Sequence, residues 1–395
     1  MARILSAISD RVGITGSGIQ SVLVISASAL LSGVAHADQT VTIGYAGPLT
    51  GQVAHVGKDA ENGARLAIED ANAAGIKIKG QLVHFQLVSE DDAADPKTAV
   101  TVAQKFVDQN VNGVVGHITS GATIPASKVY ASAGIPQVSP SATNPELTRQ
   151  GFATAHRVIG DDSEVGRVIA QYMGKTKGYK RVAVVDDRSA YGQGLADVVV
   201  KELKAAGVDV VDREFVSDKS VDFRGILTSI KSKDAQAVFY GGVDAQAGPL
   251  RKQMTGLAMK IPLVGSAIET DKFIELAGPA AAEGTVSAES GLPLDKMRNG
   301  QAFAAKYTKY GAVVLFAPYA YDATWALINS MKLADSTVPA DYLPAMKKVE
   351  FDGVTGKIAF DAKGDLRAAT VTLYQAKDGK FQPISTVTNS GAPAQ

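Results

Sequence analysis

The chain of 395 residues contains no cysteine, so it has no disulfide, thiol nucleophile or thiolate metal site. Neither sign of charge is in excess, because 40 lysines and arginines balance 40 aspartates and glutamates. No overall field therefore attracts nucleic acid or an anionic membrane. The five histidines are scattered, without a helical pair or an HExxH motif, and a metal site is not expected.

Motifs of catalysis and nucleotide binding are also missing. No GxSxG elbow and no Walker A sequence occurs in the chain. Gly192-Gln193-Gly194 follows an expected strand and opens an expected helix, but a dinucleotide fingerprint needs a small residue where Asp197 stands. An acid at that position repels a pyrophosphate. The sequence predicts no catalytic residue and no cofactor, and so it does not favour an enzyme.

The first 37 residues have the layout of an export signal. Arg3 and Arg11 precede an apolar run from Val22 to Val34 that is too short, and too poor in large side chains, to span a bilayer stably. The small-x-small pattern of a cleavage site follows at Ala35-His36-Ala37. We expect secretion to the periplasm and a mature chain that begins at Asp38. The alternative is an N-terminal membrane anchor.

The rest of the chain alternates short β-branched runs with amphipathic helical stretches. Such alternation predicts parallel sheets covered by helices, and the chain is long enough for two of them in series. After about Ser287 the alternation of strands and helices becomes less regular, with a long helix expected over 318–332 and a β-rich tail from Gly356. The expected strands are 41–45, 83–88, 114–116, 136–138, 182–185, 208–211, 237–240 and 261–264.

Two hydroxyl-rich segments follow neighbouring strands, which is where open parallel sheets bind ligands. Residues 119–123 (TSGAT) open a helix, whose free N–H groups together with the hydroxyls suit an anion, and residues 139–146 (SPSATNPE) follow the next strand. The alternative is ordinary helix capping, since Thr143 and Glu146 have the spacing of a capping box. Two such loops at adjacent strand ends favour a carboxylate pocket. Tyr191 precedes the Gly-Gln-Gly turn, where its ring can lie over a ligand cleft; the alternative is a hydrophobic staple on the following helix.

Longer stretches around these residues resemble the periplasmic leucine/isoleucine/valine-binding proteins of ABC transporters. The resemblance covers essentially the whole mature chain. It implies an α/β fold of the type I periplasmic-binding-protein kind, a clamshell of two doubly wound parallel-sheet lobes joined by multiple crossovers. The implied parts are a signal peptide (1–37), lobe one (38–160 plus 290–366) and lobe two (161–289 plus 367–395). The similar stretches are DDAADPKTAV (91–100), GHITSGATIPASKVY (116–130), SPSATNPELT (139–148), DDRSAYGQGLA (186–196), FYGG (239–242) and FDAKGDL (360–366).

The same resemblance implies a ligand site between the lobes. Ser120 and Thr143 match the positions that hold a ligand α-carboxylate through hydroxyl and backbone N–H. Other matched positions border the ligand or its side-chain pocket: Ile118, Thr119, Ser141, Ala142, Tyr191 and Phe316. Val56 and Val243 stand where some members of the family have aromatic residues, and the family's disulfide positions are Ala94 and Thr119 here.

The most important departure concerns the acidic residue that pairs with the ligand ammonium. Its position falls at Ser266 or at Ala267, and neither side chain carries a charge. Either Glu269 or Asp244 supplies the charge, or the natural ligand has no α-ammonium. We favour Glu269, because the rest of the pocket pattern is intact. The alternative for Glu269 is a solvated residue near a helix cap.

The leading hypothesis is a monomeric receptor that captures a branched-chain-like amino acid and delivers it to an ABC-type permease. A second hypothesis is a receptor for a small carboxylate without an α-amino group. A third is a sensory ligand-binding protein that signals to a membrane kinase. A secreted enzyme on the same scaffold is disfavoured by the missing catalytic motifs.

Overall fold

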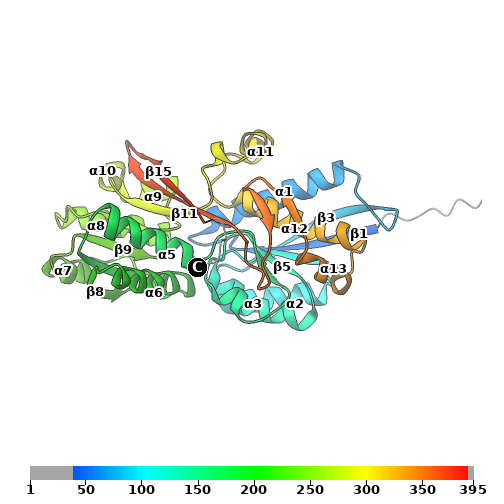
Figure 1. Cartoon of the computed structure of the whole chain (residues 1–395), viewed down its shortest axis with the longest axis horizontal. Helices are drawn as coiled ribbons and strands as arrows, with labels where there is room; N and C mark the ends of the chain where they lie inside the picture. Colours follow the sequence, from blue (N-terminus) through cyan, green and yellow to red (C-terminus); the bar gives the residue numbers. More distant parts are fainter. Residues whose placement is uncertain (1–38, 390–395) are drawn as a thin grey trace, which may run out of the picture. The chain divides into compact units, whose positions relative to one another are not determined.

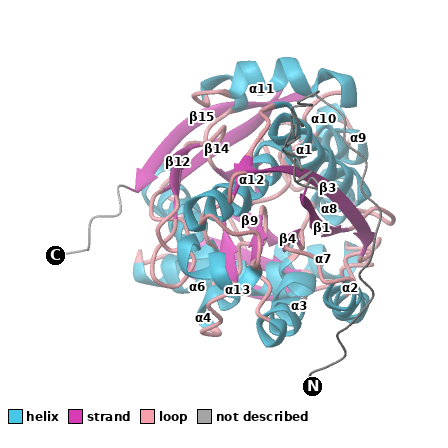
Figure 2. Cartoon of the chain, turned by 90° about the vertical axis from the view of Figure 1, so that its right-hand side faces the viewer, coloured by secondary structure: helices cyan, strands magenta, loops and turns pink. Residues whose placement is uncertain are grey.

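A computed structural model describes residues 39–389 of the chain, and the predicted signal peptide lies outside the described residues. Within 39–389, no helix combines the length and the apolar character that a membrane span requires. The strands of this part form two large sheets and one small hairpin. In Figure 2 the helices lie around the strands of these sheets.

The first sheet has the strand order β2-β3-β1-β4-β5-β6, and all neighbours except β2 and β3 run parallel. Its central strand β4 is buried along its whole length, which explains its uninterrupted apolar sequence GVVG. The strands are β1 (Gln39–Gly47), β2 (Lys77–Ile78), β3 (Gln81–Asp91), β4 (Gly113–Gly116), β5 (Gln137–Ser139) and β6 (Ala155–Arg157).

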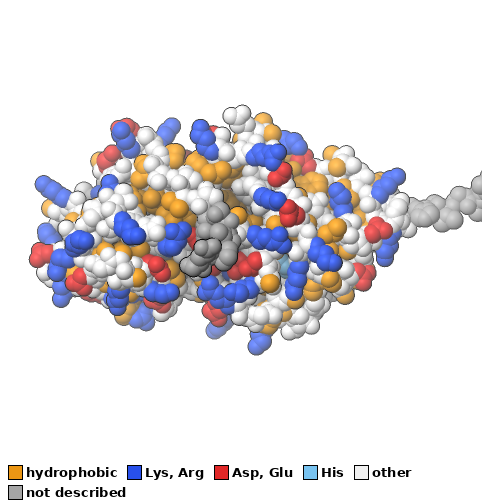
Figure 3. All heavy atoms as spheres, in the orientation of Figure 1, with side chains coloured by type: hydrophobic (Ala, Val, Ile, Leu, Met, Phe, Trp, Pro, Cys, Tyr) orange, Lys and Arg blue, Asp and Glu red, His pale blue; other side chains and the backbone are white. Residues whose placement is uncertain are grey.

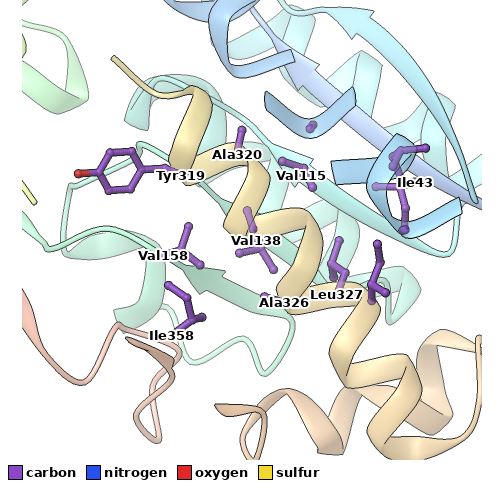
Figure 4. Close-up of a cluster of buried hydrophobic side chains, with 14 of the residues drawn as sticks. Ile43, Val115, Val138, Val158, Tyr319, Ala320, Ala326, Leu327 and Ile358 are labelled. Carbon is purple, nitrogen blue, oxygen red and sulfur yellow. The ribbon is translucent and has the colours of Figure 1, made fainter. Parts of the chain in front are cut away.

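Two pairs of helices cover the two faces of the first sheet. Helices α1 (Ala54–Ala73) and α12 (Ala317–Ala334) pack on one face, and α2 (Pro96–Asp108) and α3 (Ser120–Ala133) pack on the other (Figure 1). Alternate residues of one strand therefore enter different cores: Val115 packs under α12, whereas Val114 packs against α2 and α3. Figure 4 shows the first of these cores, where Ile43, Val115 and Val138 of the sheet meet Ala320 and Leu327 of α12.

The second sheet has the strand order β15-β14-β11-β10-β9-β7-β8, parallel from β11 to β8 and antiparallel at β14 and β15. Helices α5 and α6 cover one face, and α7, α8 and α9 cover the other. The strands are β7 (Arg181–Asp186), β8 (Asp209–Phe215), β9 (Ala237–Gly241), β10 (Leu263–Gly265), β11 (Val286–Ser290), β14 (Ala369–Lys377) and β15 (Lys380–Asn389). The helices are α5 (Asp162–Gln171), α6 (Ala190–Ala205), α7 (Arg224–Ser232), α8 (Asp244–Gly256), α9 (Asp271–Ala277) and α10 (Pro279–Ala282).

The chain passes between the two sheets after β6, after β11 and again before β14. The crossing segments lie side by side: the Ser290 hydroxyl donates to the Gly160 carbonyl at 3.4 Å, and a Cβ on Gly160 would lie 2.9 Å from that of Ala369. This pattern confirms the predicted type I fold with multiple crossovers.

The remaining elements are α4 (Glu146–Arg149), the π-helical turn Tyr172–Thr176, the 3₁₀ turns Leu294–Lys296 and Thr308–Tyr310, α11 (Gly300–Tyr307), α13 (Pro339–Met346), and the hairpin β12 (Glu350–Asp352) and β13 (Lys357–Ala359).

The Gly-Gln-Gly run opens α6, as expected, but Tyr191 and these glycines lie in the first turns of that helix and not in a separate turn before it. Ser189 caps the helix by accepting the N–H of Gly192 at 2.9 Å. Thr143 and Glu146 do not form a capping box: α4 begins at Glu146, and the side chain that accepts the backbone N–H of Glu146, at 2.9 Å, is that of Asn144. The hydroxyl of Thr143 is thus not occupied by the helix.

The visible surface carries no extended region of one charge. Lysine and arginine side chains alternate with aspartate and glutamate across the face drawn in Figure 3. The mixture of charges on this face is consistent with the equal numbers of basic and acidic residues in the sequence. The face shows no continuous row of basic side chains that could bind a nucleic-acid backbone.

Candidate functional site

The two hydroxyl-rich segments lie side by side at the carboxyl ends of β4 and β5. These strands are parallel neighbours, so the loops that leave them meet at one edge of the sheet. Ser139 donates its hydroxyl to the carbonyl of His117 at 2.9 Å, and the backbone N–H of Asn144 donates to the Ser120 hydroxyl at 3.3 Å. We call residues 117–120 and 139–144 the grip loops.

The grip loops are buried, yet several of their polar atoms are unused. Ile118, Ser120, Ser141, Ala142 and Thr143 are all buried, and Ser141 donates its hydroxyl to the carbonyl of Ile118. Among the described residues, the hydroxyls of Thr119 and Thr143 have no hydrogen-bond partner at normal geometry. Buried polar atoms are nearly always paired in folded proteins, so these two hydroxyls can still accept or donate to a further polar group.

Arg157 fixes the second grip loop from behind, and sequence reasoning missed it. Its side chain is fully buried at the end of β6 and donates to the carbonyls of Ala142 at 2.6 Å and Asn144 at 3.0 Å. The same guanidinium pairs with Asp365 at 2.7 Å and donates to the Thr148 hydroxyl at 3.0 Å. The planar fork of arginine suits several acceptors at once, which a lysine could not reach.

The FDAKGDL segment supplies the partner of Arg157. Asp361 accepts the backbone N–H groups of Lys363, Gly364 and Asp365, which closes a tight turn. Gly364 has φ +100°, a conformation that L side chains rarely adopt, and its carbonyl accepts the N–H of Arg157 at 3.0 Å. The turn therefore aims Asp365 at Arg157.

A second buried network lies beneath the first grip loop. His117 is fully buried between Asp92, whose carboxylate lies 2.7 Å from Nδ1, and the Tyr130 hydroxyl, 3.0 Å from Nε2. Asp92 also accepts the N–H of Ala94, one of the two positions that bear cysteine in the family. A hydrogen-bonded network thus links the start of α2 to the grip loop in a chain that has no disulfide.

The second sheet contributes a wall of acidic and hydroxyl side chains, which we call the second wall: Tyr191 in α6, Ser266 and Glu269 after β10, and Glu289 in β11. Glu289 accepts the Ser287 hydroxyl and the backbone N–H of Ile268, the latter at 3.3 Å. Burial raises the pKa of Glu289 to about 7, and burial together with the neighbouring Glu289 raises the pKa of Glu269 to about 8.

Sequence reasoning missed Glu289, because an acid within a strand carries no signal of its position. Burial also raises the pKa of the Tyr191 hydroxyl, and the charges of Asp162 and Glu289 raise it further, whereas the Ser266 hydroxyl opposes the shift. Tyr191 is therefore near both Ser266 and Glu289, and the structure brings three of the second-wall residues together.

Asp244, the other candidate for the ammonium, has partners of its own. Its carboxylate lies 2.8 Å from Nε2 of His55 in α1 and accepts the Thr270 hydroxyl at 2.6 Å. The bond to His55 joins a helix of the first sheet to a helix of the second, next to Val56 and Val243. Asp244 therefore holds elements together and is not a free countercharge.

Phe316 is placed by a buried carboxylate. Asp59 of α1 accepts the backbone N–H groups of Phe316 at 2.7 Å and Ala317 at 2.8 Å, at the start of α12. The Phe316 ring is partly buried and packs edge to face on Tyr319, with ring centres 6.5 Å apart.

Across the described part of the chain, no group of three or more histidine, aspartate or glutamate side chains is placed to hold a metal ion.

This architecture and site belong to a class of extracytoplasmic receptors that bind small solutes. The chain is a member of the periplasmic binding protein family, whose model matches residues 40–380. It is 35% identical over 375 residues to the amino acid binding protein of Pseudomonas aeruginosa, covering 92% of this chain and 98% of that relative. It is also 35% identical over 357 residues to the Leu/Ile/Val-binding protein homolog 1 of Brucella abortus, covering 89% and 95%. The resemblance predicted from the sequence is thereby confirmed.

Solved structures agree with this assignment. The branched-chain amino acid substrate-binding protein LivJ of Streptococcus pneumoniae, in complex with isoleucine, superposes with a TM-score of 0.80 at 28% identity, covering 89% of this chain and 100% of that one. The leucine-binding protein LivK of Thermotoga maritima has the same fold, with a TM-score of 0.82 at 23% identity and coverage of 88% and 98%.

Proposed function

We propose that the protein captures an α-amino acid with a branched apolar side chain and delivers it to an ABC-type permease. The observation that carries this proposal is the pair of grip loops, in which the buried hydroxyls of Thr119 and Thr143 have no hydrogen-bond partner among the described residues, together with an acidic second wall. The names of the relatives, which bind leucine, isoleucine or valine, support the same ligand class.

In this proposal Ser120 and Thr143 hold the ligand carboxylate, with the backbone of Ala142 between them. Hydrogen bonds to a charged group contribute about 1.5–3 kcal/mol each. Ile118, Thr119, Ser141, Val243 and Phe316 border the ligand side chain, and Tyr191 and Ser266 approach from the second wall. We retain Glu269 as the predicted second-wall partner of the ammonium, because it is the ionisable residue next to Ser266 and Ala267 in the loop after β10.

The remaining parts of the proposal concern the chain as a whole. We propose that the protein is a monomeric periplasmic receptor without catalytic activity. Its two lobes comprise residues 38–160 plus 290–366 and residues 161–289 plus 367–395. The second candidate ligand, a carboxylate without an α-amino group, is favoured by one observation: the position matched to the family's acid carries Ser266 or Ala267, and neither is charged.

The decisive experiment first identifies the ligand by mass spectrometry of small molecules released when the purified protein is denatured. Calorimetry then compares L-leucine with its des-amino analogue, 4-methylpentanoate, on the wild type and on Glu269→Gln. The matched control is Glu275→Gln, an exposed glutamate of α9 that pairs only with Lys272 among the described residues, at 3.0 Å. We expect the wild type and the control to prefer leucine, and Glu269→Gln to abolish that preference. If the wild type binds 4-methylpentanoate as well as leucine or better, the amino-acid receptor is wrong and the carboxylate receptor takes its place.

A further inference from the structure

A second cavity, of about 400 Å³, lies between α11, α12 and the hairpin of β12 and β13. Its volume falls within the range of about 300–1,000 Å³ that is usual for the sites of small ligands. None of the residues that line it belongs to the grip loops or to the second wall. Four of the lining side chains are aromatic, and they come from all three segments: Phe303, Tyr321, Trp325 and Phe351.

Helix α12 presents a line of large side chains to this cavity. Between Ala317 and Met331 every residue of the helix is buried except Tyr321, Trp325 and Asn329, which are partly exposed. Residues four positions apart lie on the same face of a helix, so these three side chains form one continuous line. All three line the cavity. The partly exposed aromatic residues of α12 are therefore gathered at a single place.

The aromatic rings of the cavity are inclined to one another. The rings of Phe303 and Tyr321 have centres 5.4 Å apart and planes at 76°, and those of Tyr321 and Trp325 have centres 6.3 Å apart and planes at 53°. The Tyr321 hydroxyl donates to Asp70 at 2.8 Å, and the indole N–H of Trp325 is buried beside that hydroxyl. A flat ligand stacks best in a slot between parallel rings, whereas inclined rings form a corner that suits a compact, rounded group.

Hydrogen bonds within the chain hold the walls of the cavity in place. Asp322 of α12 accepts the backbone N–H groups of Val354 and Thr355, both at 2.8 Å. Asn299, just before α11, donates its side-chain amide to the carbonyl of Gly353 at 3.1 Å. These bonds attach the turn between β12 and β13 to both helices, so the cavity is formed before any ligand arrives.

The charged side chains around the cavity are paired as well. Lys306 donates to Asp70 at 2.7 Å, and Asp352 pairs with Arg298 at 2.5 Å. With Asp322, three carboxylates meet two cations, which leaves an excess of one negative charge. A sugar or another ligand that depends on hydrogen bonds would find few free partners here. The cavity instead offers aromatic rings and a negative field.

A quaternary ammonium group has the properties that this cavity requires. It is rounded and positively charged, it has no N–H to donate, and it is attracted to the faces of tryptophan and tyrosine rings. We propose that the cavity binds a quaternary ammonium group of the kind that choline carries, with Tyr321 and Trp325 as its main contacts. The site is separate from the proposed amino-acid site and does not depend on it.

Fluorescence tests the proposal directly, because Trp325 is the only tryptophan of the chain. We expect choline to change this fluorescence saturably at pH 8, where Asp322 is ionised although burial raises its pKa to about 6. The neutral analogue of the same shape, 3,3-dimethylbutan-1-ol, should leave the fluorescence unchanged. Vesicles of phosphatidylcholine and of phosphatidylglycerol distinguish the sources of the group, because a lipid-headgroup site binds the former vesicles and a site for a free solute binds neither.

Calorimetry with choline locates the site. Trp325→Leu removes one ring and should weaken choline binding by about five- to thirtyfold, whereas the control Tyr321→Phe keeps its ring and should bind choline within about threefold of the wild type. Leucine affinity should be the same in Trp325→Leu and the wild type, which shows that the variant is folded.

Three results would overturn the quaternary ammonium site. They are the absence of a saturable response to choline, an equal response to the neutral analogue, and an unchanged choline affinity in Trp325→Leu. If the wild type fails to bind leucine but binds choline, the proposed amino-acid receptor is wrong and the quaternary ammonium site stands.

Discussion

Replacing Arg157 by methionine removes the guanidinium that holds the second grip loop while keeping a long apolar stem. The side chain is fully buried and makes four hydrogen bonds, to Asp365, to Thr148 and to the carbonyls of Ala142 and Asn144. The change leaves the Asp365 carboxylate without its cation and the two carbonyls without a donor.

The expected magnitude follows from these partners. Removing one member of a buried ion pair costs about 3–5 kcal/mol, and a buried carbonyl that loses its donor costs about 1–3 kcal/mol. The contributions share one side chain and do not add. The Asp365 side chain is 20% exposed, so water compensates part of its loss. We therefore expect Arg157→Met to lower the free energy of unfolding by about 3–4 kcal/mol.

Urea unfolding measures this change, and Arg149→Met is the control. Arg149 is half exposed, and its ion pair with Asp161 is 3.4 Å long, so its loss should cost less than about 1 kcal/mol. The double variant Arg157→Met with Asp365→Asn should recover part of the stability, because the carboxylate is no longer left unpaired. Equal destabilisation by Arg157→Met and Arg149→Met would show that Arg157 does not hold the second grip loop in place.

Three further predictions follow from the site. Ser120→Ala and Thr143→Ala should each weaken leucine binding by about ten- to a hundredfold in calorimetry, with little loss of stability, and unchanged affinity in both would contradict the carboxylate grip. The hydrogen bond to Asp244 raises the pKa of His55, so the ion pair between them stabilises the fold at low pH and is lost as the pH rises through that raised pKa. In thermal unfolding, His55→Gln should therefore destabilise the protein by about 0.5–1 kcal/mol at pH 5.5 and leave its stability unchanged at pH 9. Leucine affinity should rise between pH 5 and pH 8, because Glu269 and Glu289 of the second wall, whose pKa values are raised to about 8 and about 7, must lose their protons to attract an ammonium. A flat profile would show that neither carboxyl meets the ammonium.

The alternation of β-branched runs and amphipathic stretches was sufficient to predict two helix-covered parallel sheets, because the period of the apolar residues sets how a segment can be buried. The same local logic placed Ser120 and Thr143 together, since neighbouring parallel strands end at the same edge. A local pattern could not decide whether Thr143 caps a helix or faces a pocket. Both uses need the same residue types at the same spacing, and only the tertiary structure shows that Asn144, and not Thr143, accepts the first N–H of α4.

Arg157 and Glu289 could not be found from local sequence, because an ionisable residue is usually solvated and its position in a strand does not show that it is buried. Arg157 meets Asp365 across 208 positions of the chain, and Glu289 meets the backbone of Ile268 from the adjacent strand. The sequence by itself determined the sheets, their helices and the loops at their ends, since these depend on neighbouring residues. Tertiary structure alone decided which charges are buried and which of them are left without a partner, because burial and pairing depend on segments that meet only when the chain has crossed between its two sheets.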